Sequence, residues 1–153
     1  MQQGHASFLG IATLMFVAGI GIPLMATLNA GLGRQIASPA AATFILYAVG
    51  LVLSLGVMLA AGGFPAAEKF QGIKPQFYMG AIFVVFYIVA ITWAAPKIGV
   101  GNAVFFVLLG QLVAAAGIDH FGLWGAVQSA ITPKRILGIA VMAFGVYLAR
   151  KPA

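Results

Sequence analysis

Long apolar runs separated by short polar breaks dominate the sequence. The runs cover residues 8–29, 39–61, 76–95, 101–121 and 134–149. The hydrocarbon core of a bilayer is about 30 Å thick, and a helix needs roughly 20 apolar residues to cross it. The first four runs reach that length, and the last is the shortest. The pattern predicts an all-α integral membrane protein with five transmembrane helices in one domain, residues 1–153.

Turn and helix-end residues fill the breaks between the runs. Residues 31–35 and Ser38-Pro39 separate the first two runs, and Pro75 suits the first turn of the third helix. Residues 96–99 (Pro-Lys-Ile-Gly) end the third helix, and Thr132-Pro133 is typical of the start of the fifth. These signals support the division into five helices.

The first and fourth runs raise two further questions. No Lys or Arg precedes the first run, which is also longer than the apolar region of about 7 to 15 residues in a signal peptide, so we expect a retained helix. After the fourth run, residues 121–130 are apolar but broken by glycines. We expect this connection to lie in the membrane interface with Trp124 as its anchor.

Composition excludes a water-soluble domain. Apolar residues make up 63% of the chain and charged residues 7%, against about 25% charged in soluble domains. The net charge of +6 comes from bases dispersed between the apolar runs, as in residues that reach lipid headgroups, so we expect the lipid bilayer and no nucleic acid as partner. The chain has no cysteine and lacks both the His-Glu-x-x-His motif and a Gly-rich phosphate loop. We therefore expect no metal, no cofactor and no enzymatic activity.

The basic residues are balanced across the predicted membrane. Five spans place Lys69, Lys74, Lys134 and Arg135 on one side and Arg34, Lys97, Arg150 and Lys151 on the other, which is four against four. Lys/Arg asymmetry sets the orientation of membrane proteins, so a balanced chain can insert either way up. The balance predicts an antiparallel homodimer, which would have the architecture of an inverted repeat. A partner protein or a weaker bias could equally set one orientation.

Several short motifs carry a family resemblance. They are Gly110-Gln111-Leu112, residues 118–123 (Ile-Asp-His-Phe-Gly-Leu), residues 132–138 (Thr-Pro-Lys-Arg-Ile-Leu-Gly) and Gly145. With them the chain resembles the YdcZ-like family of short bacterial membrane proteins, within the drug/metabolite transporter superfamily. The resemblance also covers Asn29, Ser38-Pro39 and Gly99, but Met25 stands where the family's first helix tends to have Gln.

The resemblance implies a function and an assembly. It implies a multi-pass protein of the bacterial inner membrane that exports or exchanges small metabolites or drugs. Ten-helix members of the superfamily look like a fused inverted duplication of such a unit, which agrees with the charge balance. We therefore expect a dimeric secondary transporter with alternating access for a small-molecule substrate. The alternative is an accessory or scaffolding membrane subunit without transport activity of its own.

Polar side chains within the spans are the candidates for solute contact. Gln111 lies about halfway along the fourth run, and its amide offers both a donor and an acceptor. An interhelical hydrogen bond is the alternative for this residue. Asn29, at the predicted end of the first helix, is a second candidate for substrate binding. Helix capping is the preferred explanation both for it and for Asn102.

Asp119 and His120 are the candidates for proton coupling. A carboxylate within the membrane often marks a proton pathway, and histidine titrates near neutral pH. Both residues lie near the end of the fourth helix, where Asp119 could instead pair with Lys134 or Arg135. We favour that structural role for Asp119.

Aromatic side chains of the second and third runs could line a solute cavity. Tyr87 and Trp93, with Tyr47 and Phe86, present π faces that suit flat or cationic solutes. A position facing lipid or in the aromatic belt of the interface is the commoner explanation for such residues. No catalytic residue and no metal ligand is expected.

Overall fold

The fold of the protein is taken from a computed structural model that describes the backbone of residues 2–149 and the side chains of residues 8–149. Arg150 and Lys151, which the charge count includes, lie outside the described residues. Across that described range the regular structure is entirely helical, with five α-helices and three short 3₁₀-helices. The chain divides into two compact units, the first ending at Pro96 and the second beginning at Lys97.

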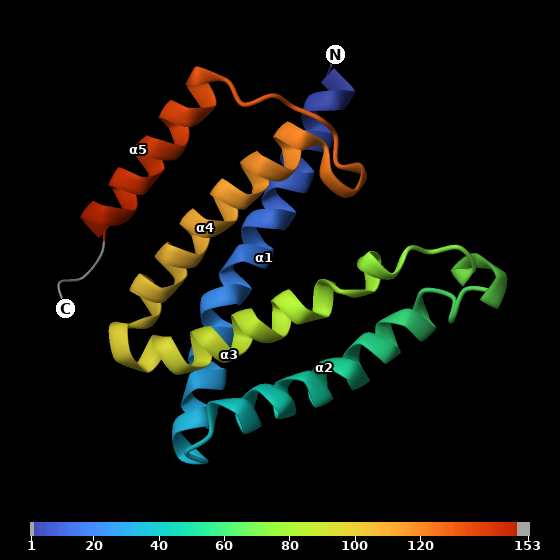
Figure 1. Ribbon diagram of the computed structural model, residues 1–153. Helices are drawn as coiled ribbons and strands as arrows, with labels where there is room; N and C mark the ends of the chain where they lie inside the picture. Colours follow the sequence, from blue (N-terminus) through green and yellow to red (C-terminus); the bar gives the residue numbers. More distant parts are fainter. Residues whose placement is uncertain (1, 150–153) are drawn as a thin grey trace. The chain divides into compact units, whose positions relative to one another are not determined.

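The first unit contains three long helices (Figure 1). They are α1 (Gln2–Gln35), α2 (Pro39–Ala60) and α3 (Gly80–Ile98), whose last two residues fall in the second unit. Two 3₁₀-helices, η1 (Ala67–Phe70) and η2 (Pro75–Tyr78), lie in the connection between α2 and α3. Pro75 was expected in the first turn of the third helix. It is the first residue of η2, which leads into α3.

Helix α1 continues six residues beyond its predicted end at Asn29. The two glycines at positions 31 and 33 suggested a turn, yet both remain helical. The turn is formed instead by residues 36–38, where Ser38 N donates to Gly33 O over 3.0 Å and Ala37 N donates to Arg34 O over 3.3 Å. This pair of bonds is the Schellman arrangement that closes a helix C-terminus. Ser38 then caps α2, because its hydroxyl accepts from Ala41 N over 3.1 Å.

The turn holds Ala37 in the left-handed region, with φ of 52°. Glycine is the residue that usually occupies this position, because a Cβ is unfavourable there. We therefore expect Ala37→Gly to raise the free energy of unfolding by a few tenths to about 1 kcal/mol. Thermal unfolding in detergent, followed by far-ultraviolet circular dichroism, measures the difference. Ala40→Gly, inside α2, is the control and should destabilise, because there the helix needs no left-handed residue.

The buried core of the first unit consists mostly of small residues. Ala26 and Ala30 of α1, Ala42 of α2 and Ala95 of α3 are all buried, as are Ile88 and Ile91. Most of the large apolar side chains of the same helices are exposed. Small residues let helix backbones approach closely, as is usual between membrane helices, and leave the larger side chains to lipid or to another chain.

The second unit is built from α4 (Val100–Phe121), η3 (Leu123–Gly125) and α5 (Pro133–Ala149), as Figure 1 shows. Gly99, with φ of 86°, separates α4 from the preceding helix. Gly122 ends α4 in the left-handed conformation. The connection that follows, residues 122–132, contains the exposed side chain of Trp124.

Four helical segments within the described range are long and apolar enough to cross a membrane. They are Phe8–Gln35, Pro39–Ala60, Pro75–Ile98 and Val100–Phe121. The prediction of an all-helical chain with these four segments is confirmed. Helix α5 also forms where it was predicted, but its 17 residues give a length of about 25 Å, shorter than a typical hydrocarbon core. That α5 spans the membrane stays a prediction.

Candidate functional site

A buried hydrogen bond joins α1 to α3 in the first unit. Asn29 Nδ2 donates to Thr92 Oγ1 over 2.7 Å, and the two residues are 4% and 2% exposed. Asn29 therefore lies inside α1 and does not cap a helix end, which corrects the capping explanation. The reason is the continuation of α1 to Gln35, which satisfies the backbone around Asn29 within the helix. Its side chain remains available for an interhelical bond.

Gly33, one turn after Asn29, allows the close approach that this bond requires. A Cβ at Gly33 would lie 3.2 Å from Thr92 Cγ2, 3.5 Å from Pro39 Cα and 3.6 Å from Ala42 Cβ. All three helices of the first unit therefore meet around this glycine. A side chain here would push against α2 and α3 together.

The contact between Gly33 and Thr92 predicts that a substitution at Thr92 relieves the destabilising effect of a substitution at Gly33. We expect Gly33→Ala to lower the free energy of unfolding by about 1 kcal/mol, because the new methyl group crowds Thr92 Cγ2. Thr92→Ser removes that Cγ2 and keeps the hydroxyl that accepts from Asn29. In the Thr92→Ser background, Gly33→Ala should instead stabilise by about 0.5 kcal/mol, since alanine favours helix. Denaturation of the four proteins in detergent tests this, and equal effects in both backgrounds would contradict it.

A groove of about 540 Å³ runs between α1 and α2. Asn29 is the single polar residue among its lining residues, which are Met25, Leu28, Asn29, Leu32, Ile45, Leu46, Val49, Gly50 and Leu53. Met25 lies one turn from Asn29 and lines the same groove. In this chain the groove therefore offers an apolar surface with one amide.

Two tyrosine hydroxyls in the first unit are buried without a hydrogen-bond partner among the described residues. They belong to Tyr47 of α2 and Tyr87 of α3, and both side chains are half-buried. An unpaired buried hydroxyl is costly and calls for a water or a ligand. Tyr87 was a candidate for solute contact, and its hydroxyl is one of these two buried groups. Trp93, the other aromatic candidate, is exposed on α3.

Gln111 lies near the middle of α4 and is exposed. No hydrogen bond to its side chain is formed within residues 8–149. An amide exposed to hydrocarbon is unfavourable because lipid cannot satisfy its donors and acceptors. Gln111 therefore needs a polar neighbour that the two described units, taken singly, do not supply.

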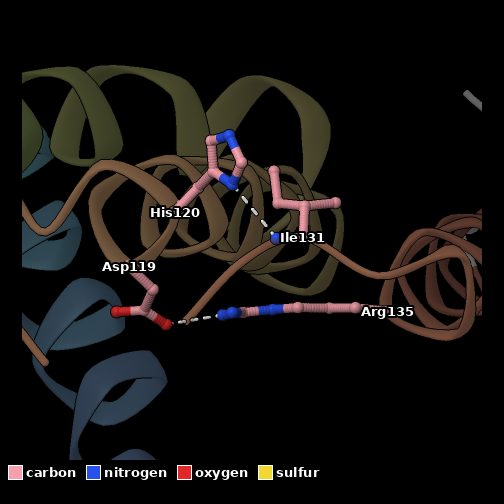
Figure 2. Close-up of polar contacts among 4 residues, drawn as sticks. All are labelled: Asp119, His120, Ile131 and Arg135. Atoms are coloured by element: carbon pink, nitrogen blue, oxygen red, sulfur yellow. Dashed lines mark hydrogen bonds and ion pairs between the residues drawn. The ribbon is translucent and has the colours of Figure 1, made fainter. Parts of the chain in front are cut away.

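Asp119 and His120 contact the start of α5 and the connection that precedes it, as Figure 2 shows. Asp119 Oδ2 accepts from Arg135 Nη2 over 2.6 Å, with 36% and 31% of the two side chains exposed. His120 Nδ1 accepts from Ile131 N over 3.1 Å, and the His120 ring meets Phe121 edge-on at 4.7 Å. The expected ion pair of Asp119 is therefore present, with Arg135 as its partner.

Asn102 lies inside α4 and caps the end of the preceding helix, whereas capping was predicted at the start of the fourth helix. Its Nδ2 donates to Ile98 O over 2.9 Å, and Ile98 is the last residue of α3. A hollow of about 280 Å³ lies beside it, lined by Ile98, Gly99, Val100, Gly101, Asn102, Phe105 and Ala149. The hollow is formed within the second unit.

With this geometry in place, comparison with known proteins identifies the family. Residues 10–148 match the family model described as "Putative inner membrane exporter, YdcZ". The chain belongs to this family. No curated protein and no solved structure matches the chain. The family and the four apolar helices make the protein a multi-pass protein of the inner membrane. An exporter family is a class of transporters and not a class of enzymes.

Membership of the family does not assign roles to residues, and the structure adds residues that the sequence did not single out. Thr92 and Gly33 complete the contact made by Asn29, and Ile131 completes the contact made by His120. The sequence signal for Thr92 was its hydroxyl inside an otherwise apolar run, the same signal that pointed to Gln111. Ile131 contributes only its backbone, so its side chain carried no signal.

Proposed function

We propose that this chain is one half of a small-solute exporter, in which two oppositely inserted copies form a path that opens to each side of the membrane in turn. Three independent observations support the proposal. The chain belongs to an inner membrane exporter family. Its bases divide four against four if all five predicted spans cross the membrane. Its helices expose most of their large apolar side chains and one mid-membrane amide.

Gln111 is the observation that carries the proposal. The residue is exposed near the middle of α4 and lacks a hydrogen-bond partner in the described residues. Lipid cannot supply one, whereas a solute path can, because polar groups at membrane depth are tolerated where they line a cavity. A second copy packed against the first would enclose such a path at the level of Gln111. The amide would then donate to and accept from a passing solute.

The first unit suggests which solutes the path accepts. The hydroxyls of Tyr47 and Tyr87 are buried there without a hydrogen-bond partner among the described residues, and neither residue has a charged residue within three positions along its helix. Phenol rings also attract cations through their π faces. Small, flat solutes with hydrogen-bond acceptors, neutral or singly cationic, therefore fit the available chemistry. Highly charged solutes do not, because no charged residue within three positions of either tyrosine compensates them.

Purified protein in liposomes tests the proposal directly. Ethidium, a flat cationic dye, and a panel of neutral aromatic metabolites serve as probes, and their release from preloaded vesicles is followed over time. We expect saturable flux of at least one probe above that of protein-free vesicles. A protein that shows no flux with any probe, yet binds other membrane proteins in the same lipid, would support the accessory-subunit alternative.

The orientation of the chain gives a separate prediction. Because the native chain contains no cysteine, single cysteines at Gln35 and Gln71 can be labelled with a membrane-impermeant maleimide. Gln35 is the last residue of α1, just before α2, and Gln71 lies in the connection that follows α2. We expect each cysteine to label from both sides of the membrane, in comparable amounts. Labelling of each position from one side only would rule out dual insertion.

Single-molecule photobleaching of the same labelled protein in lipid determines its stoichiometry. We expect two bleaching steps for most particles, as a dimer requires. Predominantly single steps at saturating label would contradict the dimer, whatever the orientation result.

A further inference from the structure

Three hydrogen bonds from residues 128–131 tie the connection between α4 and α5 back to the last turn of α4. Gln128 Nε2 donates to His120 O over 3.2 Å, and Ser129 N donates to Asp119 O over 2.8 Å. The third is the bond from Ile131 N to His120 Nδ1 over 3.1 Å (Figure 2). The first two acceptors are backbone carbonyls, which do not titrate. The third acceptor is a ring nitrogen, which does.

The chemistry of that ring nitrogen fixes its protonation state. A backbone N–H can only donate, so Nδ1 of His120 carries no proton while the bond exists and the neutral ring holds its proton on Nε2. Protonation of the ring places a second N–H at Nδ1. Two donors then face each other, and the bond to Ile131 is lost. Histidine is the side chain that changes charge between about pH 5 and 8.

We infer that His120 is a proton-operated latch: neutral, it holds the connection of residues 122–132 against the end of α4, and protonated, it releases Ile131 and with it the start of α5. Ile131 lies close enough to α5 for its release to affect the start of that helix. Pro133 begins α5 two residues later, and Thr132 caps the helix by accepting from Arg135 N over 3.2 Å. These contacts make residues 131–135 a short, rigid segment at the N-terminus of α5.

Charged residues lie on both helices that flank the connection. They are Asp119 on the same helix as His120, and Lys134 and Arg135 on α5. Residues 122–132 of the connection contain no titratable side chain. Asp119 is already paired with Arg135 at 2.6 Å, which leaves much of its charge compensated. His120 is therefore the residue of this cluster whose contact with the connection requires an unprotonated ring nitrogen.

The ion pair gives the released helix a pivot. The Asp119 to Arg135 contact does not involve Nδ1 of His120, so it persists when the latch opens. Helix α5 can then swing about its first turn while remaining attached to α4. If the protein exports solutes as proposed above, this motion couples proton binding to the change of access, and that part of the inference rests on the proposed function. The latch itself does not.

Amide hydrogen exchange of Ile131 in lipid nanodiscs tests the latch without any transport measurement. His120→Ala removes the acceptor. The exchange rate of the Ile131 amide in this variant, measured at each pH, is the reference, because amide exchange has the same intrinsic pH dependence in both proteins. We expect Ile131 of the wild type to exchange about fivefold more slowly than in His120→Ala near pH 8, and at the same rate near pH 5. His120→Asn, whose Oδ1 occupies the place of Nδ1 but does not titrate, should keep the protection at both values.

Two results would overturn the inference. The first is protection of Ile131 in the wild type that does not change between these pH values. The second is loss of the pH response in Asp119→Asn, which keeps His120 and removes only the carboxylate. A pH-dependent Ile131 in a protein that transports nothing would uphold the latch and contradict the proposed function, so the two can fail separately.

Discussion

Replacement of Gln111 by leucine is expected to reduce solute flux to the level of protein-free liposomes. Leucine fills a similar volume and suits hydrocarbon, so the variant loses the amide without leaving a polar group unpaired. Expression, photobleaching stoichiometry and thermal stability should match or exceed those of the wild type, because the exposed amide has no partner within the described residues whose loss could weaken the fold. Flux in reconstituted liposomes and unfolding in detergent are measured on the same preparations.

The control for this variant is Val113→Leu, an exposed apolar position two residues further along α4. It changes the size of a lipid-exposed side chain and no polar group, so its flux should equal that of the wild type. Loss of dimerisation in Gln111→Leu would instead show that the amide bonds to the second copy. Full flux in Gln111→Leu would remove the residue from the path altogether.

The helices could be predicted from the sequence because their signal is composition over twenty or so residues. α4 and α5 begin within one residue of the predicted positions, since Gly99, Gly122 and Pro133 stop or start helices by their own backbone chemistry. The end of α1 was misplaced because Gly31 and Gly33 looked like turn residues. Glycine is needed at position 33 for a different reason. A Cβ at this position would lie only 3.2 Å from Thr92 Cγ2.

The candidate site was predictable only where one residue carries its own chemistry. Asp119, His120 and Gln111 stand out in apolar runs, and the ion pair of Asp119 followed from the nearby bases. Partners distant in sequence were not predictable, because nothing in the spacing of Asn29 and Thr92, 63 residues apart, indicates that they meet. The same is true of Ile131, which bonds through a backbone group that every residue other than proline possesses.

The buried pair of Asn29 and Thr92 provides the last prediction. We expect Asn29→Leu and Thr92→Val each to lower the free energy of unfolding by about 1 to 3 kcal/mol, since each leaves one polar group buried without a partner. Both replacements preserve the shape of the original side chain closely. The double variant should be no less stable than either single variant, because it removes both polar groups together. Denaturation in detergent of the four proteins gives the coupling energy, which we expect to be on the order of 1 kcal/mol.

Transport by the same proteins separates the two roles proposed for Asn29. Its Nδ2 is used by Thr92, so we expect its main role to be holding α1 against α3, and the flux per folded molecule should fall equally in Asn29→Leu and Thr92→Val. A solute contact would break that equality. Asn29 also lines the groove between α1 and α2, whereas Thr92 is not among the groove's lining residues. Loss of flux in Asn29→Leu with normal flux in Thr92→Val would therefore assign Asn29 to solute binding and make the groove part of the path.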